Sequence, residues 1–152
     1  MYLIDPSGRG ADETAVCVAS LVSGYIVIHA LVGLSGGYDE HTLEKIAKLA
    51  LQYNANLIRV ESNFGDGTVS ALLQPIAQRI CGQVGVEDYR VHGAKEARMI
   101  ASIEPVMGAH RLVFDTKVIR QEETQKQITR LADIRGALKH DDRVDVLAAA
   151  CA

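Results

Sequence analysis

Acidic residues follow the ends of segments that we expect to be strands. Asp5 comes directly after the apolar run that opens the chain, and Glu61 follows the short run "LIRV". A third group, Asp141 and Asp142, opens what we expect to be the last helix, with Asp145 on the same helix face as Asp142. Because open α/β sheets hold ligands outside the ends of their strands, these acids could share one site.

Carboxylates grouped in this way suit a site for hard divalent cations such as Mg²⁺, which prefer oxygen ligands. Two such ions about 4 Å apart can activate a water and stabilise the leaving oxygen in phosphodiester hydrolysis. Acids from distant parts of the chain are what this chemistry needs. The pattern therefore favours metal-dependent cleavage of a phosphodiester.

Each acid also has an ordinary structural explanation. Asp5 stands before "PSG" and could simply start a turn. Glu61 could end an exposed strand, and Asp141 or Asp142 could cap the last helix. The Gly-rich segments "SGRGADET" and "SNFGDGT" could present backbone N–H groups to phosphate, but neither carries a nucleotide-binding motif. Only the combination of acids favours a shared site.

The composition is that of one ordinary globular domain. The chain has 152 residues, of which 48% are hydrophobic and 23% charged. A net charge of −3 argues against binding nucleic acid by bulk charge, although a local basic groove remains compatible with it. The three cysteines are far apart and indicate reduced thiols rather than disulfides or a zinc site. The longest apolar stretch is too short to cross a membrane.

The order of apolar patterns predicts an α/β domain. The opening strand and the β-rich runs at 14–22 and 24–32 indicate three antiparallel strands. Helical spacing at 38–53, about 67–80, 95–106 and from about 141 alternates with strand-like runs at 57–60, 86–89 and 111–114. The polar segment 117–138 is expected to be mostly exposed helix. The expected fold is a mixed sheet, three antiparallel strands and then parallel strands, flanked by helices.

Four blocks of the chain are similar to a known family. "IDPSGRGADET", "IRVESNFGDG", "GAKEARMIASIEPVMGAHRLVF" and "LKHDDRVDVL" resemble, in order, the nuclease domain of the large terminase subunit of tailed bacteriophages, most of all the short-tailed coliphage type. The resemblance implies an RNase H-like fold and a metal-dependent endonuclease that cuts concatemeric viral DNA during genome packaging, in the cytoplasm of the bacterial host. It implies double-stranded DNA, the terminase ATPase domain, the small terminase subunit and the portal as partners. Because the chain has no Walker motif, we expect residues 1–152 to form the nuclease domain alone, without the ATPase.

The resemblance also implies roles for individual acids. It gives the catalytic ligands of two Mg²⁺ or Mn²⁺ ions as Asp5, Glu61 and Asp142. Asp141 and Asp145 are close alternates for the third position, and Asp12 matches an acid of the family that could support the site. Since a capping acid spends its oxygens on backbone N–H groups, we expect Asp141 to cap the last helix and Asp142 to bind metal.

Basic residues near the acids are candidates for contacts with the phosphate backbone, which supply affinity without reading sequence. These candidates are Lys95, Arg98, Arg111, Lys139 and Arg143. Any one of them could instead be ordinary solvated surface. Two other functions stay open, namely a resolvase- or integrase-like nuclease of the same fold and a non-catalytic module that grips DNA and docks on the portal. Three acids at one sheet edge favour a catalytic domain over the latter.

Overall fold

The computed structural model describes residues 2–6, 13–63, 65–133 and 141–152. Its centre is a six-stranded sheet in the order β5-β4-β1-β2-β3-β6. The strands are β1 (Tyr2–Asp5), β2 (Thr14–Val22), β3 (Tyr25–Leu34), β4 (Leu57–Glu61), β5 (Gly85–Tyr89) and β6 (Leu112–Phe114). The first three are antiparallel, whereas β4 and β6 lie parallel to β1 and β3, and β5 lies parallel to β4. This confirms the predicted mixed sheet.

A two-residue turn joins β2 to β3. Ser23 and Gly24 both have positive φ, 51° and 83°, which is the conformation that matches the twist of a tight hairpin. Glycine adopts it freely because it has no Cβ. The turn sets the register of β2 against β3, which pairs Val22 with Tyr25. On its other side, β2 pairs Ala15 with Asp5 at the end of β1.

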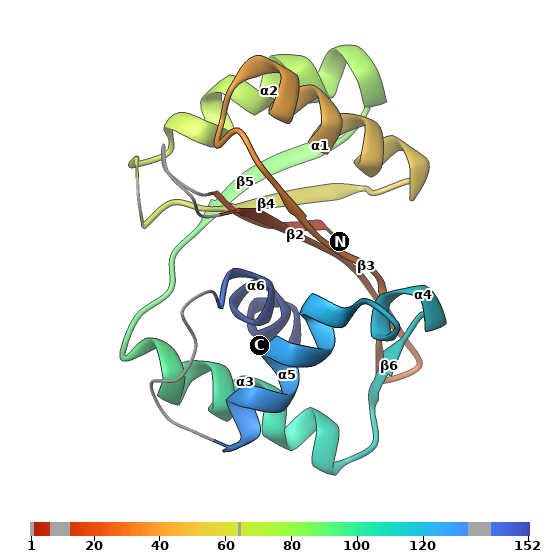
Figure 1. Ribbon diagram of the computed structural model, residues 1–152. Helices are drawn as coiled ribbons and strands as arrows, with labels where there is room; N and C mark the ends of the chain where they lie inside the picture. Colours follow the sequence, from red (N-terminus) through yellow and green to blue (C-terminus); the bar gives the residue numbers. More distant parts are fainter. Residues whose placement is uncertain (1, 7–12, 64, 134–140) are drawn as a thin grey trace.

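Helices cover both faces of the sheet (Figure 1). On one face lie α1 (Glu40–Gln52) and α2 (Thr68–Cys81), and on the other lie α3 (Lys95–Gly108), α5 (Glu122–Asp133) and α6 (Asp142–Cys151). The short helix α4 (Thr116–Ile119) follows β6. Among the described residues, no helix is both long enough and apolar enough to cross a membrane.

The helix α1 shows how the sequence specifies these elements. Its N-cap Asp39 accepts a hydrogen bond of 2.7 Å from the backbone N–H of Thr42. Leu43, Ile46 and Ala50 recur at helical spacing and are all buried against the sheet. Burying one Leu or Ile side chain contributes about 1.5–3 kcal/mol, so this face holds the helix in place.

The described part of the segment 117–138 is mostly exposed helix, as the sequence predicted, but it also buries a few side chains. It forms α4 and α5, and it buries Val118, Thr124 and Gln127. Two of these three side chains are polar, which is why apolar periodicity did not reveal the buried face. Gln127 is hydrogen-bonded within the protein, and such bonds make the burial of an amide tolerable. Residues 134–138 lie outside the described residues.

Candidate metal centre

Two of the predicted acids lie side by side because β1 and β4 are parallel neighbours. Ile4 pairs with Val60, so Asp5 and Glu61 are the next residues on the two strands and the last of each. Ile4 and Val60 belong to the core beneath α1 and α2. Since side chains alternate along a strand, Asp5 and Glu61 extend from the other face, which α6 covers.

The third acid of the group is Asp145 of α6. One carboxylate oxygen from each of Asp5, Glu61 and Asp145 lies within 4.8 Å of the other two. Asp145 is only 4% exposed, between the buried residues Val144 and Val146. The position expected for Asp142 in this group is therefore taken by the residue three places later, almost one helical turn further on. Asp142 remains near enough for its charge to raise the pKa of Asp5.

Two cations of α3 face this group. Lys95 Nζ lies 2.7 Å from Oδ1 of Asp141 and 3.2 Å from Oδ2 of Asp145. Arg98 Nη2 lies 2.7 Å from Oδ1 of Asp145, and the side chain of Arg98 is only 17% exposed. Both residues were expected to contact DNA, but here they bind the carboxylates of their own chain. They offset the cost of burying Asp145 as a charge.

Asp141 was expected to cap α6 with its side chain, but it does not. Asp141 occupies the N-cap position, but its carboxylate makes no capping hydrogen bond and binds Lys95 instead. The amide oxygen of Gln127, on α5, accepts a hydrogen bond of 3.3 Å from the backbone N–H of Val144. The Gln127 side chain also donates to Glu123 at 3.0 Å. A buried glutamine on a neighbouring helix thus provides a hydrogen-bond acceptor for a backbone N–H in the first turn of α6.

Burial and the charge of neighbouring acids raise the pKa values of Asp5 and Glu61. The pKa of Asp5 rises to about 8 because the carboxyl is buried and because Glu61 and Asp145 carry like charge beside it. The pKa of Glu61 also lies above its ordinary value, through burial and then through the charge of Asp145. A divalent cation would relieve this repulsion, and all three groups offer the oxygen ligands that such a cation prefers. The residues therefore fit a divalent metal ion.

The remaining predicted residues lie elsewhere. Arg111 precedes β6, and its carbonyl accepts from the backbone N–H of Ile26 at the start of β3. Because β3 and β6 run in the direction of β1, Arg111 lies at the end of the sheet opposite Asp5. Arg143 binds Glu13 at 3.2 Å, and its side chain is 14% exposed. Asp12 and Lys139 lie outside the described residues.

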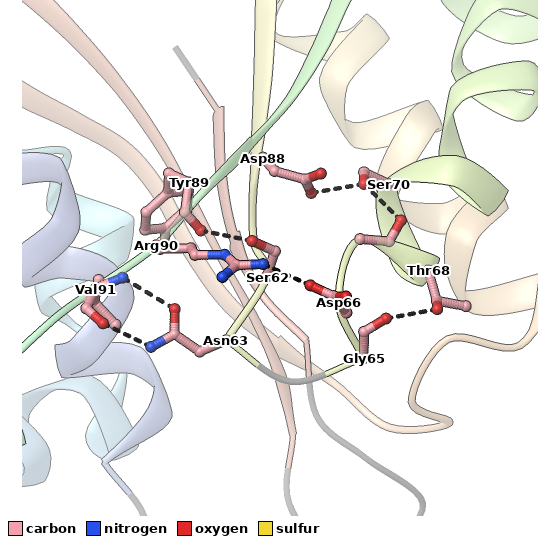
Figure 2. A network of polar contacts seen from close by, with 11 residues as sticks. Ser62, Asn63, Gly65, Asp66, Thr68, Ser70, Asp88, Tyr89, Arg90 and Val91 are labelled. Atoms are coloured by element: carbon pink, nitrogen blue, oxygen red, sulfur yellow. Dashed lines mark hydrogen bonds and ion pairs between the residues drawn. The ribbon is translucent and has the colours of Figure 1, made fainter.

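The loop after Glu61 is tied to the chain that follows β5 (Figure 2). Asn63 accepts from the backbone N–H of Val91 at 3.0 Å and donates to its carbonyl at 2.7 Å. Arg90 forms an ion pair with Asp66 on the same loop. A cavity of about 410 Å³ lies here, lined by Ser62, Asn63, Gly65, Asp66, Arg90 and His92. Its lining residues all follow the ends of β4 and β5, so the cavity lies past the ends of these two strands.

Sequence reasoning missed the roles of Lys95, Arg98 and Gln127. The spacing of Lys95 and Arg98 at i and i+3 puts them on one helix face, which is a signal that they act together but does not tell whether they face DNA or protein. Gln127 stands in a strongly polar segment, where nothing distinguishes a buried amide from an exposed one. Its role is visible only once α5 and α6 are packed together.

Comparison with known proteins gives concordant matches. The family model described as Terminase Bacteriophage T7, Ribonuclease H-like domain matches residues 4–112. The chain is 37% identical over 160 residues to the large terminase subunit of Enterobacteria phage T3, an alignment that covers 95% of this chain and 27% of that protein. The chain thus spans about a quarter of the length of this relative.

Solved structures share the fold at low sequence identity. The nuclease domain of the large terminase subunit of bacterial virus Sf6 matches with a TM-score of 0.72 at 10% identity, over 99% of this chain and 86% of that one. A mutant of the same domain solved with manganese gives 0.69 at 10% identity, over 99% and 87%. The large terminase nuclease from thermophilic phage G20c, solved with bound zinc, gives 0.68 at 19% identity, over 99% and 79%.

The family match covers most of the chain, and the relative from phage T3 agrees with it. The solved nuclease domains share the fold of this chain. The chain belongs to the RNase H-like nuclease-domain family of bacteriophage large terminase subunits.

Proposed function

We propose that this domain is a metal-dependent endodeoxyribonuclease that cuts concatemeric viral DNA during genome packaging. The observation that carries the proposal is the convergence of Asp5, Glu61 and Asp145 within 4.8 Å. We assign these three residues as the ligands of two Mg²⁺ or Mn²⁺ ions. In this assignment Asp145, not Asp142, is the third ligand. The negative charge of Asp142 still raises the pKa of Asp5.

Divalent ions at this site would supply Lewis-acid stabilisation of the scissile phosphate and of the leaving oxygen. The residues of the chain hold and orient the group. Asp5 and Glu61 are fixed by the pairing of β1 with β4. Asp145 is fixed by the packing of α6 and by the ion pair with Arg98. Because Arg98 is largely buried, we assign it to orienting Asp145 rather than to DNA.

Among the predicted basic residues, Lys95 is the one we assign to the DNA backbone near the carboxylates. Its side chain is 43% exposed, and its ammonium group lies at the edge of the acidic group. An ammonium held there could turn toward a phosphate oxygen when the acids gain other cations. Arg111, at the opposite end of the sheet, would contact DNA only at a separate place.

The decisive experiment is digestion of supercoiled plasmid with Mg²⁺, Mn²⁺ or EDTA. We expect nicked and linear products with either metal, none with EDTA, and none from Asp5→Asn. Glu40→Gln is a matched control, because Glu40 is an exposed acid in the first turn of α1. Equal cleavage by wild type in EDTA would contradict a metal mechanism. A four-way junction cut faster than linear duplex would favour the resolvase-like alternative, and absence of all cutting would favour a DNA-gripping module.

The wider role rests on the longer proteins of the family. We propose that the domain works with a terminase ATPase domain, the small terminase subunit and the portal, in the cytoplasm of the bacterial host. The length of the phage T3 relative, of which the alignment covers 27%, supports a place within a larger protein. Co-purification of the domain with each partner, against the same Asp5→Asn variant, tests docking separately from cutting.

A further inference from the structure

Tyr89 stands in line with the two strand-end acids. Glu61 pairs with Tyr89 on β5. On the other side of β4, Ile4 pairs with Val60, so Asp5 lies next to Glu61. The three residues therefore occupy one level across three neighbouring parallel strands. Asp88 points to Ser70 on α2, with a hydrogen bond of 2.6 Å, and Tyr89 therefore extends from the other face. Figure 2 shows the two side chains on opposite sides of β5. That other face is the one from which Asp5 and Glu61 extend.

The position of the Tyr89 ring is fixed from two sides. The guanidinium of Arg59, one strand away, lies 5.3 Å from the ring centroid, a cation–π contact. The carbonyl of Tyr89 accepts from the backbone N–H of Ser62 at 2.9 Å and from its hydroxyl at 3.3 Å. The ring also packs against the core beneath α3 and α6. These contacts fix the orientation of the ring and therefore the position of its hydroxyl.

The hydroxyl of Tyr89 is buried and has no hydrogen-bond partner among the residues that the structure describes. Buried polar atoms are nearly always paired, so one left over in a native protein calls for a reason. Burial and the charges of Glu61, Asp5 and Asp145 raise the pKa of this phenol. The group therefore keeps its proton and is a hydrogen-bond donor in the field of three acids.

We propose that Tyr89 is a further residue of this site, whose O–H donates a hydrogen bond to a non-bridging phosphate oxygen of the DNA strand being cut. The inference rests on the proposed nuclease function. The three carboxylates offer only acceptors when ionised, whereas a phosphate oxygen needs donors. Because Tyr89 is the strand neighbour of Glu61 on β5, the DNA strand would pass from the carboxylates toward the end of β5.

The test compares Tyr89→Phe with wild type, since this change removes the hydroxyl alone. We expect single-turnover cleavage of duplex DNA to slow by roughly three- to tenfold, the loss of one hydrogen bond. The thermal midpoint of the metal-free protein should stay the same or rise, because the hydroxyl has no partner to lose. The increase in the midpoint with Mn²⁺ should equal that of wild type, because the phenol is not assigned to the metal. Tyr25→Phe, on the exposed hairpin, is the matched control.

Two results would overturn the assignment. If Tyr89→Phe cleaves DNA at the wild-type rate, Tyr89 has no role at the phosphate. If its thermal midpoint without metal is lower than that of wild type, the hydroxyl already bonds within the protein. If wild type itself does not cut, the nuclease proposal fails by itself. In that case the affinity of wild type and Tyr89→Phe for uncut duplex DNA in Ca²⁺ tests the role of Tyr89. We expect Tyr89→Phe to bind more weakly, and equal binding would contradict the inference.

Discussion

The ammonium nitrogen of Lys95 lies 3.2 Å from Oδ2 of Asp145, so a cation of the protein already contacts the carboxylate group. The pKa of Lys95 is raised because, although burial lowers it, the hydrogen bond that Lys95 donates to Asp141 and the charge of Asp145 outweigh that effect. Lys95 is thus held in its charged form. It compensates the same negative charge that a divalent ion would, so we expect such an ion to compete with Lys95 for Asp145.

Replacing Lys95 by Met is expected to have opposite effects without and with metal. Without metal, loss of the ion pair should lower the free energy of unfolding by about 1–2 kcal/mol, less than for a fully buried pair because Lys95 is partly exposed. With Mn²⁺, the rise of the thermal midpoint should be larger than in wild type. Lys126→Met removes an exposed ion pair on α5 and should change neither quantity. A smaller Mn²⁺ effect in Lys95→Met would contradict competition.

The register of α6 predicts different outcomes for its two central acids. Asp145→Asn should abolish both plasmid cleavage and the Mn²⁺-induced rise of the thermal midpoint, because it removes an ionised oxygen from the group of three. Asp142→Asn should retain most of the cleavage, since it changes only a neighbouring charge. The two variants differ by three positions on one helix and are compared in the same assay. Loss of cleavage in Asp142→Asn with cleavage kept in Asp145→Asn would return the third ligand to Asp142.

The metal-free domain should lose stability as the pH rises. The pKa of Asp5 is about 8 in the folded protein against 3.8 ordinarily, so the folded state holds a proton that the unfolded chain releases. Its contribution to stability is complete below about pH 4 and is lost as the pH rises through 8. Thermal melts from pH 5 to 9 in EDTA should therefore fall more steeply for wild type than for Asp5→Asn. Equal slopes would show that Asp5 titrates normally.

Metal should reverse this trend over the same range. Ionised carboxylates bind the ion and protonated ones do not, so the stabilisation by Mn²⁺ should grow as the pH rises, with release of protons on binding. Titration calorimetry in two buffers of different ionisation enthalpy measures that release. A stabilisation that does not depend on pH would place the metal away from Asp5.

Gln127→Ala should lower the free energy of unfolding by about 1–2 kcal/mol, because Val144 at the start of α6 loses its acceptor in a buried place. Cleavage should fall too, since α6 holds Asp145. Gln74→Ala on the exposed side of α2 should stay within about 0.5 kcal/mol of wild type. Urea unfolding gives both values. Equal effects from the two glutamines would mean that the contact contributes nothing.

The sheet and two of the three acids follow from the sequence because their signals are local. Apolar runs ending in an acid identify Asp5 and Glu61, and "SG" between two β-rich runs identifies the hairpin. Parallel neighbours end together, so acids at their ends meet. These inferences need only strand periodicity and topology.

The third acid required information that the sequence does not contain. Asp142 and Asp145 lie on neighbouring positions of one helix face, and only the rotation of α6 on the sheet decides that Asp145 enters the group. Likewise, whether Lys95 faces DNA or Asp145 depends on how α3 packs against α6. Tyr89 stood in a weak strand pattern, and its alignment with Glu61 follows from the register of β5. Tertiary packing, rather than local pattern, settles each of these.

Asp145 comes from α6, the last helix that the structure describes, whereas Asp5 comes from β1, the first described strand. A nascent polypeptide on the ribosome that has not yet made α6 carries two of the three carboxylates, whatever else has folded. The proposed metal site is therefore complete only when α6 has docked on β1, β2 and β3. If the proposed nuclease function holds, an incomplete copy that lacks α6 would not cut the DNA of the cell that makes it.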